Sequence, residues 1–248
     1  MRRSLPLLVS LLLIQLFSGA QAQMINQTTK DWIQLSGDPV PLTSGVISSF
    51  NHYNKQLLGT SYEDSTFQAG NIRFYGKVPG TRLDSLIGVP VRHDLLTQQL
   101  EILAGPNNIR VAQAPQVRQF TINNRKLQAA TYYVNVREFR GEADVLLGFF
   151  EVLTTGRATL LRYPSAIIRK SDYNVALSVG NKDDALELKQ AWYVAKGPKA
   201  VLFTPGKRGI LSLFADKEAE MTTYLKTQKP DLKSRAGLTA TVAYYNSL

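Results

Sequence analysis

The sequence of 248 residues contains no cysteine and only two histidines, His52 and His93. The lack of cysteine excludes disulfides, cysteine-ligated zinc and a thiol nucleophile. A metal site would have to depend on carboxylates, which are few: 19 Asp and Glu stand against 29 Lys and Arg. The formal net charge is therefore +10, and this charge favours anionic partners.

Long apolar runs are also missing, and none reaches the roughly 20 residues that a membrane-spanning helix needs. The N-terminal run Leu5–Phe17 follows Arg2 and Arg3 and precedes Ala20-Gln21-Ala22. This order of basic, apolar and small residues is typical of a secretory signal peptide, although a buried N-terminal helix is an alternative interpretation. We predict that residues 1–22 are removed, that the mature chain is exported to the periplasm or the extracellular space, and that it has no transmembrane segment.

The rest of the chain divides into three parts by its hydrophobic pattern. Residues 23–58 are predicted to form an N-terminal arm with one short helix. Residues 59–205 contain short runs of period two separated by turn residues, which indicates an antiparallel β meander forming a sandwich or a partly open barrel. Residues 206–248 are predicted to form short amphipathic helices packed on the sheet. The predicted fold class is therefore mainly β (α+β).

Several hairpins are predicted within the β-rich part. One joins Phe149–Leu153 to Arg157–Tyr163, and another joins Trp192–Val194 to Ala200–Phe203. Asn123-Asn124 is predicted to form a two-residue hairpin turn. Asn174–Val179 alternates like a further strand.

The C-terminal helices carry recognisable ends. Asp216 is predicted to cap one helix, which stops at Lys229-Pro230, and Ser234 is predicted to cap the next. The preceding Gly206-Lys207-Arg208-Gly209 lacks the leading glycine of a phosphate loop, because position 201 is Val201. We interpret this segment as a basic turn that opens a helix.

Short segments of the chain are similar to those of a known group of proteins. The segments are Gly59–Asp64, Phe67–Gly70, Gly88–Arg92, Gln99–Glu101, Gly148–Leu153, Gly156–Leu161 and Ala243–Leu248. Together they resemble uncharacterised exported proteins common in Bacteroidota, over about Gly59–Leu248. Where those proteins tend to read Arg-Tyr-Asn, this chain has Arg92-His93-Asp94. The resemblance implies a bacterial cell-envelope or extracellular setting and supplies no catalytic residues.

His93 and Asp94 are the strongest candidates for a catalytic pair, because a carboxylate can orient a histidine that acts as a general base. Adjacent residues on a strand point to opposite faces, however, and the chain has no Gly-x-Ser-x-Gly motif to present a nucleophile. We therefore predict a turn-forming Asp94 beside a surface or edge His93.

The remaining carboxylates suggest no site by their spacing. Asp183-Asp184 is interpreted as a solvated turn, and Glu218 with Glu220 as acids in the first turn of a helix. Glu101 and Glu151 would suit glycoside hydrolysis if they lay about 5 to 10 Å apart, but isolated glutamates on strands are typical of the polar side of a sheet. We predict no catalytic residue, no metal site and no cofactor.

The net positive charge is the overall property of the sequence that bears on function. Basic residues flank many of the predicted turns: Arg118, Arg125, Lys126, Arg157, Arg162, Arg169, Lys170, Lys196, Lys199, Lys207 and Arg208. They are interpreted first as solvated faces and edge protection, and as a surface for anionic lipid headgroups or acidic glycans. Nucleic acid is not expected, because the chain is predicted to be exported.

The sequence therefore predicts an exported, non-enzymatic β-rich envelope protein with a binding or scaffolding role. Its partners would be anionic envelope components or another envelope protein. A periplasmic carrier of an apolar or lipid ligand is one alternative, and an unrecognised hydrolase is a second.

Overall fold

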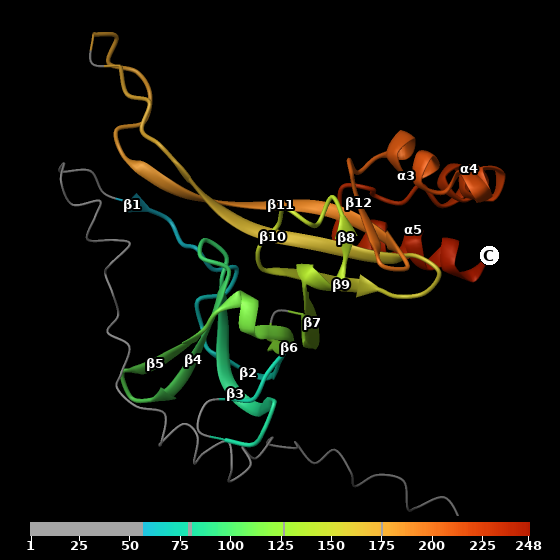
Figure 1. Cartoon of the computed structure of the whole chain (residues 1–248). Helices are drawn as coiled ribbons and strands as arrows, with labels where there is room; N and C mark the ends of the chain where they lie inside the picture. The colour runs from blue at the N-terminus through green and yellow to red at the C-terminus, as the bar shows by residue number, and fades with distance from the viewer. Residues whose placement is uncertain (1–56, 79–80, 126, 175) are drawn as a thin grey trace, which may run out of the picture.

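The computed structural model describes residues 57–78, 81–125, 127–174 and 176–248 (Figure 1). The predicted signal peptide, most of the predicted arm with its helix, and His52 lie outside the described residues. Lys126 lies outside them as well.

The described strands form one open and mostly antiparallel sheet, with the order β5-β4-β3-β2-β6-β7-β9-β10-β11-β12-β8. Two short strands pair in parallel: β1 with β11, and β8 with β12. The strands are β1 Leu57–Leu58, β2 Gln68–Phe74, β3 Ser85–Asp94, β4 Gln99–Gly105, β5 Asn108–Ala112, β6 Val117–Asn124, β7 Ala129–Asn135, β8 Arg140–Gly141, β9 Phe149–Thr154, β10 Thr159–Arg169, β11 Asp184–Lys196 and β12 Lys199–Phe203. The prediction of a mainly β fold with a C-terminal helical segment is confirmed.

Strands β2 to β7, called here the N-terminal half-sheet, bury a core of their own. Phe120 on β6 stacks on Tyr133 on β7, with ring centroids 4.5 Å apart, and Val91 on β3 is fully buried in the same cluster. An extra residue on β3 near Gly88 produces a bulge opposite β2, and the φ of +69° at Gly88 suits a residue without a Cβ. A bulge bends the strand, which helps the sheet to curve around this core.

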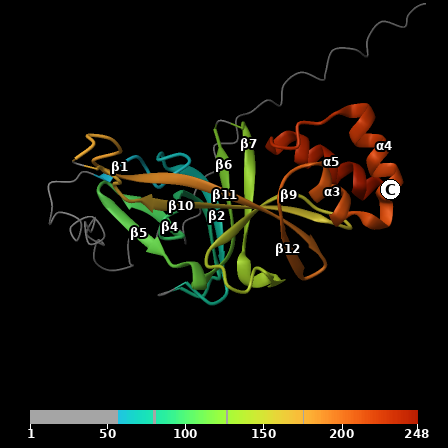
Figure 2. The same cartoon turned by 90° about the horizontal axis from the view of Figure 1, so that it is seen from above.

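Strands β9 to β12, called here the C-terminal half-sheet, are covered on one face by helices. These are α3 Lys207–Leu213, α4 Glu218–Gln228 and α5 Arg235–Ser247, with a 3-10 turn at Ala215–Lys217 before α4. Figure 2 shows the helices gathered at the end of the molecule that carries β12. Phe214 stacks on Tyr245 at 4.0 Å between ring centroids, and both side chains are almost fully buried with Trp192 of β11 in the same cluster. The predicted packing of the C-terminal helices on the sheet is confirmed.

The start of α5 and the end of α4 agree with the prediction from the sequence, and the start of α4 does not. The Ser234 side chain accepts a hydrogen bond from the Gly237 N–H at 3.0 Å, and Lys229 ends α4 with a φ of +45°. The prediction that Asp216 caps α4 is wrong. Asp216 lies in the 3-10 turn, where its carboxylate accepts hydrogen bonds from Arg157 and the Tyr245 hydroxyl instead.

The two predicted hairpins are formed by β9 with β10 and by β11 with β12. The predicted two-residue turn at Asn123-Asn124 is wrong, because β6 continues to Asn124 and the Asn124 side chain accepts a hydrogen bond from the Leu127 N–H at 3.0 Å in the turn that follows. Asn174–Val179 is not a strand either. A single bridge between Asn174 and Val179 closes the loop that joins β10 to β11.

Candidate functional site

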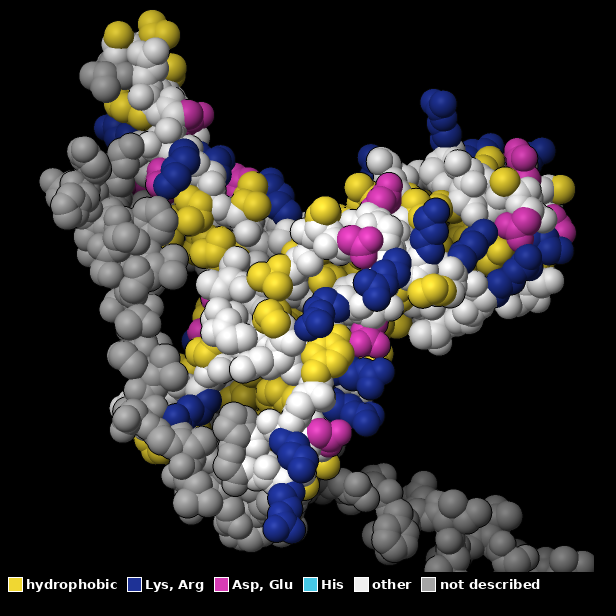
Figure 3. All heavy atoms as spheres, viewed as in Figure 1, with side chains coloured by type: hydrophobic (Ala, Val, Ile, Leu, Met, Phe, Trp, Pro, Cys, Tyr) yellow, Lys and Arg dark blue, Asp and Glu magenta, His cyan; other side chains and the backbone are white. Residues whose placement is uncertain are grey.

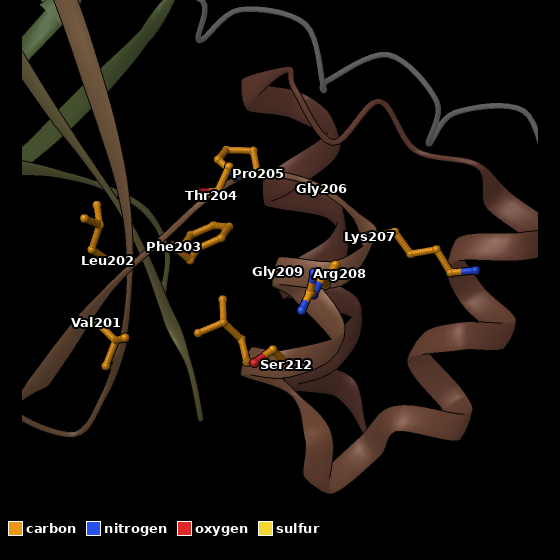
Figure 4. Close-up of a pocket in the computed structure, with 11 residues that line it drawn as sticks. Val201, Leu202, Phe203, Thr204, Pro205, Gly206, Lys207, Arg208, Gly209 and Ser212 are labelled. Atoms are coloured by element: carbon orange, nitrogen blue, oxygen red, sulfur yellow. The ribbon is translucent and has the colours of Figure 1, made fainter.

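An open groove of about 590 Å³ lies between β12 and α3 (Figure 4). The chain leaves β12, turns through Pro205 and Gly206, and returns as α3 beside the strand that it has just left. Gly209 permits this close return, because a Cβ at position 209 would lie 2.3 Å from the Thr204 carbonyl oxygen. The groove is therefore a direct product of a tight connection between a strand and a helix.

The groove combines apolar walls with a basic rim. Val201 and Phe203 line it from β12, and Leu213 lines it from α3. Lys207 and Arg208 are exposed at the start of α3, and within the described residues no carboxylate forms an ion pair with either of them. A second open groove of about 550 Å³ is lined by the same two cations together with Leu211 and Glu218. The rim is therefore a place where positive charge is available to a ligand.

Several other cations of this half of the molecule form ion pairs. Asp216 forms ion pairs with Arg157 at 2.7 Å and with Lys196 at 3.4 Å. Arg169 forms an ion pair with Glu187 at 2.8 Å. The contrast distinguishes Lys207 and Arg208 from the basic residues that take part in surface ion pairs.

The outer edge of β12 is only partly covered. Strand β8 pairs with Lys199 and Ala200, and in the described part of the chain no strand pairs with the outer edge beyond them. The backbone N–H of Leu202 donates to the Glu142 carboxylate, which follows β8 directly. A side-chain carboxylate therefore occupies a backbone donor that a neighbouring strand would use in a longer sheet.

A second polar feature is a buried cluster of charged residues that joins distant parts of the chain. Glu151 on β9 is fully buried and lies directly opposite Arg162 on β10, with Oε2 2.5 Å from the Arg162 Nε. Its other carboxylate oxygen contacts Arg235 at the start of α5. The Arg162 guanidinium also donates to both oxygens of Glu63, at 2.5 and 2.8 Å. The cluster thus joins the segment before β2 to the sheet and to α5.

The electrostatics of this cluster hold its charges in place. Burial alone would raise the pKa of Glu63, but hydrogen bonds and charge from Arg162 outweigh it and hold the pKa of Glu63 below its usual range. Burial lowers the pKa of Arg162, whereas Glu63 and Glu151 raise it by more, so the net shift is upward. The upward shift keeps Arg162 charged, and the cluster is suited to holding segments together rather than to transferring protons.

His93 lies on the inner face of the N-terminal half-sheet, and the prediction of a surface or edge position is wrong. Its ring is 5.5 to 5.7 Å from the rings of Phe120, Tyr133 and Phe149, each in an edge-to-face arrangement. Neither ring nitrogen forms a hydrogen bond with the described residues. The period-two alternation that buries Val91 continues to His93, which explains its inward position.

The surroundings of His93 keep its imidazole neutral. Burial lowers the pKa of His93 to about 4, and the neighbouring Gln98 amide and Glu63 carboxylate oppose only part of this effect. Asp94 behaves as predicted: its carboxylate accepts hydrogen bonds from the Leu96 N–H and the Thr97 hydroxyl, both at 2.9 Å, in the turn after β3. Asp94 therefore shapes a turn and makes no hydrogen bond to His93.

The structure does not bring Glu101 and Glu151 together as neighbours in the sheet. Glu101 is on β4, and β3, β2, β6 and β7 separate that strand from β9. Glu101 has its own partners, Arg92 at 2.6 Å and the Tyr62 hydroxyl at 3.0 Å. Each of the two carboxylates is therefore held by an arginine on its own part of the sheet.

The other acidic candidates have structural roles. Asp184 accepts hydrogen bonds from the Ser171 N–H and from Lys170, at 2.8 and 3.0 Å, where β11 begins. Glu218 and Glu220 lie in the first turn of α4, as predicted. The interpretation of Gly206–Gly209 as a basic turn that opens a helix is confirmed, since α3 begins at Lys207.

Sequence reasoning did not identify two contacts, because their partners are far apart in the chain. Glu63 and Arg162 are separated by 99 residues, and Glu142 and Leu202 by 60. A single glutamate within the apolar stretch Phe149–Leu153 is the one local signal of a buried charge. No local signal marks the open edge of β12.

Within residues 57–248 as described, no three His, Asp or Glu side chains are grouped to hold a metal ion. Across the same residues, no helix has the length and apolar character needed to cross a membrane. Comparison of the chain with models of protein families, with curated proteins and with solved structures finds no match.

Proposed function

We propose that this chain is an exported, non-enzymatic binding protein of the bacterial cell envelope, and that the groove between β12 and α3 holds its ligand. The ligand carries an anionic group next to an apolar one. The observation that supports this proposal is that two cations, Lys207 and Arg208, line the same groove as the apolar residues Val201, Phe203 and Leu213.

The charge of the whole molecule supports an anionic ligand. The chain has a formal net charge of +10, and Figure 3 shows Lys and Arg side chains spread over the visible face with fewer Asp and Glu among them. Such an electrostatic field raises the rate at which anions encounter the protein. A local pair of cations beside an apolar surface then provides a site where an anionic ligand binds. Cations already held by Asp216 contribute less, since their charge is balanced.

The contacts of the candidate catalytic residues support a binding role. Glu101 is paired with Arg92, Glu151 with Arg162, and His93 is enclosed by aromatic rings. An acid–base catalyst needs a group that can reach a substrate and exchange a proton, and these side chains are committed to packing or ion pairs. The carrier and the hydrolase rest on no feature of the described residues comparable to the groove.

Calorimetric titration with dodecyl phosphate tests the proposal. We expect binding that weakens at least tenfold in the double variant Lys207→Glu with Arg208→Glu, which corresponds to about 1.4 kcal/mol. The matched control reverses two exposed cations that do not line the groove, Lys226→Glu with Lys229→Glu, and retains the affinity. Absence of binding, or equal binding by both double variants, would overturn the proposal.

Export is tested separately by mass analysis of the protein made in a bacterial host with its full leader. The mature protein is expected to begin at Gln23, after the small residues at positions 20 and 22. Recovery of the intact N-terminus would contradict export.

A further inference from the structure

We infer that the ligand of the groove is an extended acidic segment of another protein, which adds to the outer edge of β12 as a further strand. This inference rests on the proposed function and names the class of partner. Three features carry it: a strand edge that no described strand covers beyond Ala200, a backbone donor already bound to a carboxylate, and a helix whose first two residues are cations that line the groove beside β12.

The strand edge is suitable for backbone pairing. The inner edge of β12 pairs with β11, and its outer edge is covered by β8 only at Lys199 and Ala200. The next outward-facing backbone donor is the N–H of Leu202, because alternate residues of an antiparallel strand direct their N–H groups to opposite sides. In the described chain this N–H has a side-chain acceptor in place of a strand. An added peptide would therefore continue a ladder that β8 begins.

The side chains on the two faces of the edge suit an extended peptide. Val201 and Phe203 point toward α3, since Phe203 lies in the core beneath the helices. Leu202 alternates to the opposite face, and this residue is 49% exposed. A strand laid beside β12 presents its own side chains alternately to these two faces. Helix α3 forms the wall of the groove that faces β12 (Figure 4).

The charges select an acidic peptide and disfavour a second copy of this chain. Lys207 and Arg208 are available at the rim, and Arg140 and Lys199 are exposed at the end of the edge that β8 covers. Two copies pairing edge to edge would bring these cations together, and like charges across paired strands are destabilising. A partner with acidic side chains reverses the sign of the same interactions.

Glu142 occupies the hydrogen-bond donor that a partner strand would use at this edge. Its carboxylate bound to the Leu202 N–H is an internal stand-in for the acceptor that a partner strand would supply. A docking strand has to displace this carboxylate before it pairs with Leu202. Glu142 therefore competes with the partner, and its removal is expected to strengthen binding, whereas removal of the rim cations weakens it.

Fluorescence anisotropy with two nine-residue peptides tests the inference. One peptide alternates valine and glutamate, and the other has the same composition with two central residues N-methylated, which removes backbone donors and keeps the charge. We expect the first peptide to bind at least tenfold more tightly than the second. Equal binding of the two peptides would overturn strand addition.

Variants of the full mature chain provide the second arm of the experiment. Glu142→Ala is expected to bind the first peptide three- to tenfold more tightly, and Lys207→Glu with Arg208→Glu at least tenfold more weakly. The control Lys226→Glu with Lys229→Glu retains wild-type affinity. Unchanged or weaker binding by Glu142→Ala, with circular dichroism equal to that of wild type, would overturn the role of the β12 edge.

The two proposals fail in different ways. Binding of dodecyl phosphate that depends on Lys207 and Arg208, without discrimination between the peptides, leaves the proposed function standing and overturns strand addition. Absence of binding by dodecyl phosphate and by both peptides overturns the proposed function together with the inference that rests on it.

Discussion

The N-terminal and C-terminal half-sheets bury their apolar faces in different ways. Strands β2 to β7 supply a core almost entirely from their own side chains, with Phe120 and Tyr133 stacked at its centre. Strands β9 to β12 depend on three helices, whose Phe214 and Tyr245 close the core. The groove lies in the second half, where a helix returns beside the strand that precedes it. A sheet that is covered by a separate layer has a boundary between strand and helix, and the groove lies along that boundary.

The two cores meet at the buried charged cluster. Phe149 belongs to the first core and Leu153 packs against the second, and Glu151 lies between them on the same face of β9. Arg162 and Arg235 neutralise Glu151 there, and Arg162 also holds Glu63. This charged cluster holds the two apolar cores in one arrangement relative to each other. A buried charge that lost its ion-pair partners here would have no water molecules to take their place, so other arrangements are disfavoured.

Removal of residues 206–248 should have the largest effect, because it takes away the helices that cover the C-terminal half-sheet and leaves the N-terminal half-sheet with its own core. The truncation exposes Trp192, Val194 and Phe203 on the face that the helices cover, and the expected result is aggregation on expression. Size-exclusion chromatography with light scattering measures it. A soluble monomer with an unchanged β signal in circular dichroism would show that the C-terminal half-sheet does not need its cover.

Truncation of one aromatic ring in each core compares their stability. Phe214→Ala and Phe120→Ala each remove a side chain that is at most 1% exposed, and each should lower the free energy of unfolding by about 3 to 5 kcal/mol. Urea unfolding followed by tryptophan fluorescence and far-UV circular dichroism should give one coincident transition in both variants, because β7 and β9 pair directly across the two halves. Separate transitions would mean that the halves unfold independently.

Arg162→Met tests the charged cluster between the cores. The substitution leaves Glu63 and Glu151 without their shared guanidinium and should lower the free energy of unfolding by about 3 kcal/mol. Addition of Glu151→Met should recover part of this loss, because the second change removes a fully buried charge that keeps only Arg235 as its partner. A double variant less stable than Arg162→Met would contradict this account of the cluster. Urea unfolding at neutral pH provides the measurement.

His93 should produce a smaller effect that depends on pH. Its pKa is about 4 in the folded chain, against 6.5 for an unperturbed histidine, so the unfolded chain binds more protons between these values and stability falls as the pH drops from 6.5 to 4. The loss is at most about 3 kcal/mol, and below about pH 4.5 the depressed pKa of Glu63 adds to it. Asp94 and Arg162 also act on the His93 charge, in opposite directions.

His93→Leu isolates the contribution of the imidazole. In this variant the free energy of unfolding should change less between pH 6.5 and 5 than in the wild type, while the decline below about pH 4.5 remains. Urea unfolding at half-unit pH intervals measures both slopes. An unchanged slope between pH 6.5 and 5 in His93→Leu would assign the acid sensitivity to other groups.

Local patterns predicted those parts of the fold that depend on neighbouring residues. The hairpin of β11 and β12 follows from apolar runs on either side of Gly197-Pro198, and the start of α5 follows from Ser234. The burial of His93 could also be predicted from the sequence, since His93 continues the alternation of buried residues that includes Val91. The prediction of a surface position rested instead on the neighbouring Asp94 as a turn residue.

Contacts between distant residues account for what sequence reasoning missed. The placement of β6 beside β2 rather than beside β5 is a choice of sheet order that no period of two encodes. Asp216 has the residue type of a helix cap, yet Arg157 and Tyr245 supply stronger partners from other segments. Of the candidate site, the basic turn at Lys207 and Arg208 was predicted, and the strand edge facing it was not.

Gly209 sets the width of the groove by the atom that it lacks. Any larger side chain at this position would meet the Thr204 carbonyl and push α3 away from β12. The spacing between helix and strand is thus governed by a missing methyl group, and the width of the groove depends on a residue that contributes no side chain to its walls.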